Sequence, residues 1–346
     1  MKRTLLICLL SILPQITLAG NEKLTVLLDW FPNPEHAPLI IAKQQGYFAE
    51  KGLDVELISP TEPMDPAKLL TENKVDVGIT YEPEYMQQVD AGLPLISIGA
   101  LIDKPLNSLV ALKGNGIRSL NDLKGKRIGS NSGGLSLVML KVMLKKSGLS
   151  EKDVRISKIR YNLMQALLSH KVDAVTGIMR NMEVPMIESN SKKVVTFFPE
   201  DHGVPSYSEL VFIIHTQNIH DSRYPRFLQA LKKAVRYLDE HPQLAWEDFI
   251  KAYPETNNTV NHEAWFATMP YFAEDPAGFN DIEWHKFASF MQKNQLIKKV
   301  QPTSRYAVVL RGDNDGINHA DSDSLSSNLG HLALARIKPY FEWFTG

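Results

Sequence analysis

Cysteine is almost absent from this sequence of 346 residues. The single one, Cys8, lies within the first ten positions. Once the segment around Cys8 is removed, the remaining chain has no thiol, which excludes disulfides and cysteine-based metal sites. Charge of one sign is not in excess either, with 38 Lys and Arg against 39 Asp and Glu. This balance gives no reason to expect nucleic acid or an anionic membrane surface as a partner.

The first 19 residues have the pattern of a secretory signal peptide. Lys2 and Arg3 precede an apolar run from Leu5 to Leu13, and Thr17 and Ala19 place small residues at positions −3 and −1. The run is too short for a retained membrane span, and no later run reaches that length. We therefore expect residues 1–19 to be cleaved after Ala19 and the mature chain to be soluble and periplasmic.

Strand and helix patterns alternate along the mature chain. We expect strands, in order, at 24–28, 53–58, 75–80, 95–101, 127–129, 154–159 and 172–178, and helices between them at 37–50, 66–73, 82–91, 135–146 and 161–170. This order predicts an α/β fold with mostly parallel sheets covered by helices.

Internal sequence similarity predicts two similar lobes. Residues 69–79 resemble residues 167–175, and in both a helix end is followed by a turn and a buried strand. A common helix-turn-strand unit would produce the same similarity by chance, so two similar lobes and a chance match both stay open.

The segment from Asp29 to His36 is the strongest candidate for a binding site. Pro32 and Pro34 end the preceding strand and place a loop at its carboxyl end. Ligands bind at that edge of open α/β sheets, close to helix N-termini. The loop combines a carboxylate, an indole, a carboxamide and an imidazole, which suits a flat polar heterocycle. The alternative is a buried tryptophan in a capped loop.

Two groups of motifs carry a resemblance to a known family. Residues 46–55, Gly-Tyr-Phe-Ala-Glu-Lys-Gly-Leu-Asp-Val, resemble periplasmic substrate-binding proteins of ABC importers in the sulfonate, nitrate and thiamine-precursor branches. Sharper matches lie at residues 29–36, 105–109, 180–183 and 203–210. Together they resemble the ThiY-type proteins, which bind formylaminopyrimidine precursors of thiamine. The similarity runs from about residue 24 to residue 310.

The resemblance implies the type II periplasmic-binding-protein fold, with two α/β lobes joined by two crossing segments. One lobe would comprise residues 21–105 with 206–310 and the other residues 106–205. The crossings would fall near 103–108 and 203–208, and ligand binding would close the cleft between the lobes. Residues 311–346 lie beyond the similarity, and we expect a poorly ordered extension there.

The resemblance also implies the residues that bind the ligand. Trp30 would stack on a pyrimidine ring, with Tyr81 or Tyr207 on the other face. The Asn33 side chain, which both donates and accepts, would form hydrogen bonds with a ligand edge that carries donors and acceptors. Glu183 would accept a hydrogen bond from an exocyclic amine of the ligand. The remaining expected contacts are His36 and the backbone of Ser132 and Gly133. For Glu183 and His36 the alternatives are a helix N-terminal charge and a capping residue.

Two departures from the family pattern leave the ligand open. Leu135 and Ser136 follow the glycines of the second lobe where relatives usually have an acidic residue. Residues 81–84, Tyr-Glu-Pro-Glu, differ from the amide-bearing version common in relatives and add carboxylates near the expected cleft. Carboxylates near the cleft argue against an anion such as a sulfonate or nitrate, which would want cationic donors.

Three further expectations complete the sequence interpretation. The chain resembles eukaryotic pyrimidine synthases distantly, but their activity depends on iron and a Cys-rich motif, so we expect no enzyme, no cofactor and no metal. We expect a monomer that delivers a small pyrimidine ligand to an ABC permease. The aromatic residues expected to pack a core rather than bind a cofactor are Trp246, Phe249, Trp265, Phe266, Trp284 and Phe287.

Overall fold

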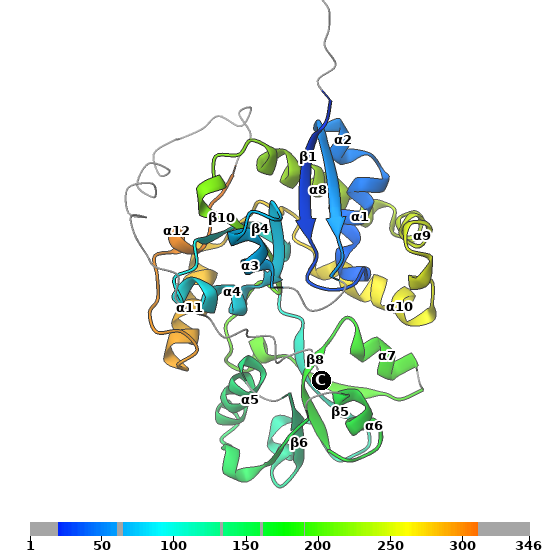
Figure 1. The fold of residues 1–346 in the computed structure, drawn as a ribbon. Coiled ribbons are helices and arrows are strands. Elements are labelled where there is room, and N and C mark those ends of the chain that lie inside the picture. The colour runs from blue at the N-terminus through cyan, green and yellow to red at the C-terminus, as the bar shows by residue number, and fades with distance from the viewer. Residues whose placement is uncertain (1–19, 61–64, 132–133, 160–161, 190, 311–346) are drawn as a thin grey trace, which may run out of the picture.

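The computed structural model describes residues 20–60, 65–131, 134–159, 162–189 and 191–310. Within these ranges the chain forms two five-stranded sheets, each covered by helices, in two lobes that lie one above the other in Figure 1. The expected signal peptide and the expected C-terminal extension lie outside the described residues. No helix in the described ranges is long and apolar enough to cross a membrane.

Lobe 1, the upper one, is built on a sheet of order β2-β1-β3-β10-β4. Its strands are β1 (Glu22–Leu27), β2 (Leu53–Ile58), β3 (Val77–Tyr81), β4 (Leu95–Ile102) and β10 (Leu210–His215). β1 is parallel to β2 and β3, whereas β10 is antiparallel to both of its neighbours. The carboxyl ends of β1, β2 and β3 therefore share one edge of the sheet.

Lobe 2 repeats this plan with the order β7-β6-β8-β5-β9. Its strands are β5 (Asn107–Leu112), β6 (Arg127–Ser130), β7 (Arg155–Lys158), β8 (Ala174–Met179) and β9 (Val194–Phe197). β6 is parallel to β7 and β8, and β5 is the antiparallel strand. In both lobes the repeated segment forms a helix that leads into the strand at the third position of the sheet, α3 into β3 and α6 into β8. This confirms the two similar lobes.

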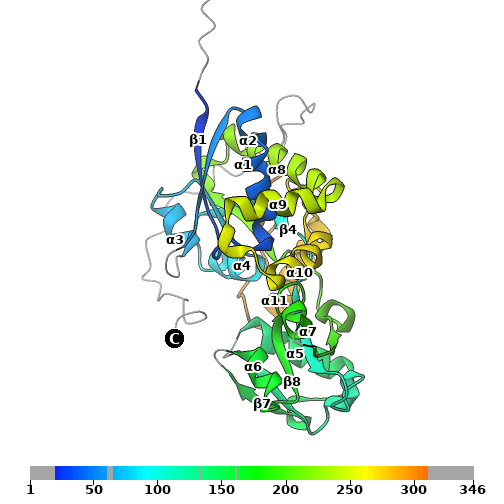
Figure 2. The same ribbon diagram turned by 90° about the vertical axis from the view of Figure 1, so that its right-hand side faces the viewer.

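Helices cover both sheets (Figures 1 and 2). In lobe 1 they are α1 (Ala37–Gln44), α2 (Tyr47–Glu50), α3 (Pro66–Thr71), α4 (Glu82–Asp90), α8 (Arg223–Glu240), α9 (Pro242–Ala252), α10 (Thr259–Thr268), α11 (Asp281–Lys293) and α12 (Thr303–Tyr306). In lobe 2 they are α5 (Leu135–Lys146), α6 (Leu163–Leu168) and α7 (Glu183–Ser189). The helix expected over 37–50 is divided because Gly46 has a φ of 74° in the left-handed region.

Aromatic side chains fill much of the core of lobe 1. Phe249 and Trp265 pack on one face of the sheet, and Trp284 and Phe287 pack on the other. Trp246 is buried as expected, but Phe266 is 41% exposed, so its expected core position is wrong. Adjacent helical residues point about 100° apart, and Phe266 is turned away from the core that its neighbour Trp265 enters.

Two buried carboxylates hold the segment that returns the chain from lobe 2 to lobe 1. Glu209 Oε2 accepts hydrogen bonds from the backbone N–H of Leu106 at 2.6 Å and from the Tyr207 hydroxyl at 3.1 Å. Glu82 Oε2 accepts from the backbone N–H of Ser208 at 2.6 Å. Leu106 lies on the first connection between the lobes, so Glu209 ties the two connections to each other.

Candidate functional site

The loop that follows β1 is held together by its own side chains. Asn33 Oδ1 accepts from the backbone N–H of Glu35 at 2.8 Å, and Asn33 Nδ2 donates to the carbonyl of Phe31 at 3.0 Å. Asn33 thereby caps the 3-10 turn Pro34–His36 that leads into α1. Both polar atoms expected to meet a ligand have partners inside the loop.

His36 orients a carboxylate. Its ring is fully buried, Nδ1 accepts from the backbone N–H of Asn33 at 3.3 Å, and Nε2 lies 2.9 Å from Asp29 Oδ1. Because Nδ1 accepts, the proton belongs on Nε2, which donates to Asp29. His36 therefore lies in the protein interior and holds the Asp29 carboxylate in place.

Asp29 is the polar centre of this edge of the sheet. Its Oδ2 accepts from the Tyr81 hydroxyl at 3.3 Å, so two donors from different elements fix the carboxylate. Burial, and then the charge of Asp29, hold the pKa of Tyr81 well above its usual range. Tyr81 stays a neutral donor that joins the ends of β1 and β3.

Trp30 and Phe31 lie at the surface of the same loop. They are 39% and 51% exposed, and their rings meet edge to face with centroids 5.5 Å apart. Exposed neighbouring aromatic rings on a loop at this edge offer a stacking face to a flat molecule. The role of Trp30 as a stacking residue stays a prediction.

Glu84 lies in the first turn of α4, directly after β3. Burial raises the pKa of Glu84 to about 7, with the negative charges of Asp65 and then Asp29 as further causes. Asp65 caps α3 by accepting from the backbone N–H of Ala67 at 3.0 Å. The charges of Asp65 and Asp29, from the segments that follow β2 and β1, thus act on the Glu84 carboxyl group at the start of α4.

A buried hydrogen bond joins the two lobes. Glu35 of lobe 1 accepts at Oε1 from Asn181 Nδ2 of lobe 2 at 2.9 Å, and the same amide group donates to Thr268 Oγ1 of α10 at 3.0 Å. Burial and the charge of Asp29 raise the pKa of Glu35 to about 8. In Figure 2, α7 and α10 meet at this junction.

Glu183 begins α7 in lobe 2, where its Oε2 accepts from the backbone N–H of Met179 at 2.9 Å. Burial raises its pKa to about 7. This bond is the helix N-terminal role that the sequence left as the alternative. One carboxylate oxygen is used in this way, and the predicted ligand contact through Glu183 remains untested.

Arg180, a cation of lobe 2 in this region, is already paired. Its guanidinium donates to both carboxylate oxygens of Glu200 at 2.5 and 2.9 Å and to the carbonyl of Asn107 at 2.7 Å. The guanidinium also lies 3.9 Å from the centre of the Phe198 ring. Arg180 therefore supports the connections between the lobes and does not offer a ready anion-binding group.

Tyr207 lies in the core beside the connection. It is 4% exposed and stacks on Phe287 with ring centroids 4.8 Å apart, and its hydroxyl donates to Glu209. This packing favours a structural role, and of the two tyrosines only Tyr81 contacts the loop after β1. Ser132 and Gly133 lie outside the described residues.

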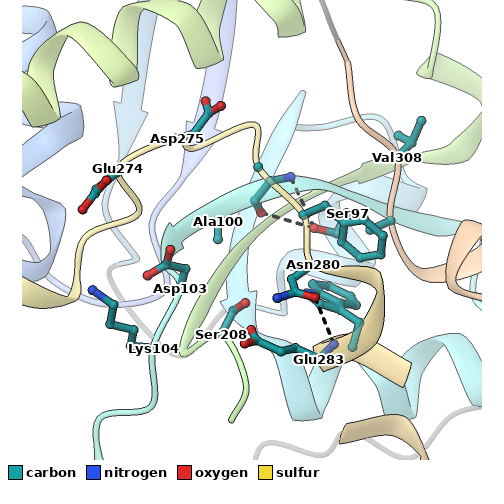
Figure 3. Close-up of a pocket in the computed structure, with 15 residues that line it drawn as sticks. Ser97, Ala100, Asp103, Lys104, Ser208, Glu274, Asp275, Asn280, Glu283 and Val308 are labelled. Carbon is teal, nitrogen blue, oxygen red and sulfur yellow. Dashed lines mark hydrogen bonds between the residues drawn. The ribbon is translucent and has the colours of Figure 1, made fainter. Parts of the chain in front are cut away.

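A separate hollow of about 360 Å³ lies on lobe 1 (Figure 3). Asp103 and Glu274 lie on its wall near β4, and Ser208 and Glu283 lie side by side below them. None of the expected site residues lines it. The cluster after β1 is the better candidate because it joins the carboxyl ends of three strands to the junction of the lobes.

Sequence reasoning gave no role to two of these residues, Glu35 and Asn181. Glu35 lay within the loop that was singled out, but its burial depends on Asn181, which is 146 positions away. The carboxylate of Asp29 was recognised as part of this loop, but its hydrogen bonds to His36 and Tyr81 were not predicted.

Solved structures with the same architecture include periplasmic binding proteins. The periplasmic aliphatic sulphonate binding protein of Escherichia coli matches with a TM-score of 0.65 and 15% identity, over 83% of this chain and 98% of that one. The likeness, together with the two mixed sheets, confirms the predicted type II periplasmic-binding-protein fold.

Relatives at the sequence level carry names that refer to thiamine biosynthesis or to pyrimidines. A Haemophilus influenzae protein named as a thiamine biosynthesis protein is 41% identical over 84% of this chain and 92% of its own. A formylaminopyrimidine-binding protein of Halalkalibacterium halodurans is 28% identical, with coverage of 80% and 87%. A Saccharomyces cerevisiae 4-amino-5-hydroxymethyl-2-methylpyrimidine phosphate synthase is also 28% identical, with coverage of 80% and 85%.

The family model described as NMT1/THI5 like matches residues 33–245. This match spans more than half of the chain and includes lobe 2, much of lobe 1, the loop residues from Asn33 onward and the two connections between the lobes. The chain belongs to the NMT1/THI5-like family.

Proposed function

We propose that this protein captures an aminopyrimidine precursor of thiamine between its lobes and delivers it to an ABC permease. The observation that carries the proposal is the similarity along most of the chain to a protein named for binding formylaminopyrimidine, on a periplasmic-binding-protein fold. The 41% identity to a protein named for thiamine biosynthesis supports the same metabolic setting.

The chemistry of the site supports a donor-rich flat ligand. Trp30 offers an exposed aromatic face, and Asp29 and Glu84 offer acceptors at the same sheet edge. A 4-aminopyrimidine presents an aromatic face and an amine donor, so each of its features finds a counterpart. A sulfonate or nitrate at this edge would meet carboxylates, which repel it. The cation Arg180 is already paired with Glu200.

The hydrogen bonds that the polar groups of the site already form support binding without catalysis. His36, a residue type often used as a general base, has both ring nitrogens engaged by Asn33 and Asp29. The fungal relatives named as synthases keep an enzyme as the second candidate. Incubating the protein with an aminopyrimidine and following it by chromatography separates the two, because only an enzyme would consume it.

The remaining parts of the proposal concern location and movement. A signal peptide cleaved after Ala19 would deliver a soluble monomer to the periplasm. The lobes would be residues 21–105 with 206–310 and residues 106–205, and they would close on the ligand about the connections held by Glu82 and Glu209.

Mass spectrometry of the ligand released from natively purified protein tests this function. The expected result is an aminopyrimidine at close to one molecule per chain. An organosulfonate or an inorganic anion in its place would assign the protein to the anion-binding branch of the same fold.

A further inference from the structure

The near-neutral charge of the whole chain is the sum of two oppositely charged lobes. Residues 106–205, which include the elements of lobe 2, carry 16 Lys and Arg against 8 Asp and Glu. Residues 21–105 with 206–310, which include the elements of lobe 1, carry 17 Lys and Arg against 26 Asp and Glu. The lobes lie one above the other in Figure 1, so positive and negative charge are in excess in opposite halves of the molecule. A charge asymmetry between the halves of a chain indicates a charged partner for one of them.

Positive charge gathers at the edge of the lobe 2 sheet that lies away from lobe 1. β5 starts at the first connection between the lobes and β8 ends just before Asn181, so the opposite ends of these strands form that edge. Lys113 follows β5 and Lys193 precedes β9 there, and the backbone N–H of Lys113 donates to the Lys193 carbonyl at 2.7 Å. Arg127 and Arg155 begin β6 and β7 and are partners in the register of these strands. We define the basic edge as the cations at these strand ends: Lys113, Arg127, Arg155, Lys171, Lys192 and Lys193.

The lysines of the basic edge carry charge that the lobe itself does not neutralise. All four are exposed: Lys113, Lys171, Lys192 and Lys193. Among the residues that the structure describes, no carboxylate forms an ion pair with any of these lysines. Of the carboxylates beside the strand ends, Asp173 pairs with Arg127 at 2.8 Å, and Asp153 accepts from the backbone N–H of Ser150 at 2.8 Å.

The acidic lobe 1 is too far away to cancel this local charge. β8 runs for six residues, which places the basic edge roughly 20 Å from the end of β8 that faces lobe 1. Charges in water are screened over about 8 Å at physiological ionic strength. A partner at the basic edge therefore meets the positive charge of lobe 2 alone.

The chemistry of this lobe fits an anionic lipid surface better than a protein partner. Protein interfaces are anchored near their centre by aromatic and other large apolar side chains. Among the described residues, the large hydrophobic side chains that are exposed all belong to lobe 1: Trp30, Phe31, Leu244, Phe266, Ile282 and Val309. Lobe 2 offers ammonium groups on flexible stems without an apolar anchor, and such groups bind phosphate headgroups through their charge.

We propose that the basic edge of lobe 2 binds the anionic phospholipid headgroups of a membrane surface. The contact is reversible and salt-sensitive, because it depends on exposed lysines. It leaves the junction with lobe 1 at the other end of the sheet, away from the lipid. The inference goes beyond the proposed function and does not depend on which ligand the protein binds.

Sedimentation with lipid vesicles tests the inference on the mature wild-type protein. Vesicles of phosphatidylcholine mixed with phosphatidylglycerol are compared with vesicles of phosphatidylcholine alone. The protein should sediment with the anionic vesicles only, and the bound fraction should fall as salt is raised. No binding to the anionic vesicles, or equal binding to both kinds, overturns the inference. The proposed function then still stands, because neither ligand nor permease is present in the experiment.

A triple variant removes three charges from the basic edge: Lys113→Gln, Lys192→Gln and Lys193→Gln. Its affinity for the anionic vesicles should fall at least about tenfold, since each lysine near an anionic surface contributes roughly fivefold. The matched control makes the same change at three exposed lysines of lobe 1: Lys293, Lys298 and Lys299. The control has the same net charge as the triple variant and should bind like wild type. Equal losses in the two variants would show that net charge, and not the basic edge, governs binding, and would overturn the inference.

Folding and self-association are measured separately. Circular dichroism establishes whether the variants are folded, and if the triple variant is not, the comparison of the two kinds of vesicle on the wild-type protein decides alone. Analytical ultracentrifugation at low salt follows self-association. Self-association of the wild-type protein that the triple variant loses, without binding to vesicles, would assign the basic edge to the acidic lobe 1 of a second copy and overturn the lipid contact.

Discussion

Replacing Asn181 by alanine should weaken ligand binding by opening the protein. Asn181 is fully buried and bridges the lobes, with bonds of 2.9 Å to Glu35 and 3.0 Å to Thr268. Alanine removes the donor and leaves the Glu35 carboxyl group buried without it, which costs about 1–3 kcal/mol. The cost falls on the closed arrangement alone, because Asn181 and its partners separate when the lobes move apart.

This free energy translates into a population. A shift of about 1–3 kcal/mol changes the ratio of closed to open protein by roughly 5–150-fold, and the apparent dissociation constant rises with the loss of the competent state. Calorimetry measures the dissociation constant, and X-ray scattering measures the radius of gyration with and without ligand. The variant should bind more weakly and show a larger radius without ligand.

The control for this experiment is Asn121→Ala, the same substitution at an exposed position of lobe 2. A second comparison uses Thr268→Val, which removes one of the two partners of Asn181. Combined with Asn181→Ala it should cost less than the sum of the single changes, since both remove one shared bond. If Asn181→Ala binds and scatters like wild type, the bridge does not stabilise closure and the reasoning is refuted.

Three other predictions concern pH, stacking and export. The raised pKa of Glu82, about 8 against an ordinary 4.5, means that the folded state holds this proton more tightly. Its contribution to stability is complete below about pH 4.5 and is lost as pH rises toward 8. Glu82→Gln should therefore flatten the fall in melting temperature between pH 5 and 8, and an unchanged slope would contradict this. Trp30→Ala should weaken flat ligands of every edge pattern by roughly 0.5–1.5 kcal/mol in calorimetry, and full affinity would show that Trp30 is not a stacking face. N-terminal sequencing of the exported protein should begin at Gly20, whereas a retained Met1 would refute the expected cleavage.

The sequence predicted those parts of the fold that depend on local patterns. Alternation identified β2, and the apolar runs between turn residues identified β3 and β4. The antiparallel strands β5 and β10 were not predicted, because each lies beside a motif that was assigned to a connection. β10 pairs with β3, more than a hundred positions earlier, and no local pattern specifies such a partner.

The candidate site was predicted to the level of its loop but not of its contacts. Pro32 and Pro34 correctly indicated where β1 ends, and the resemblance pointed to the residues around them. Asn33 and His36 form hydrogen bonds within the loop, because a short turn satisfies its own backbone groups first, and their contacts with a ligand stay predictions. The pairing of Glu35 with Asn181 exists only once the lobes meet, so no single segment could reveal it.

Titration of the purified mature protein with formylaminopyrimidine, hydroxymethylpyrimidine, thiamine, taurine and nitrate tests the central claim most directly. The account predicts heat of binding and saturation at one site for an aminopyrimidine, with no measurable binding of taurine or nitrate. Preferential binding of taurine or nitrate would contradict it, because the carboxylates at the carboxyl ends of β1 and β3 would then face the wrong kind of ligand.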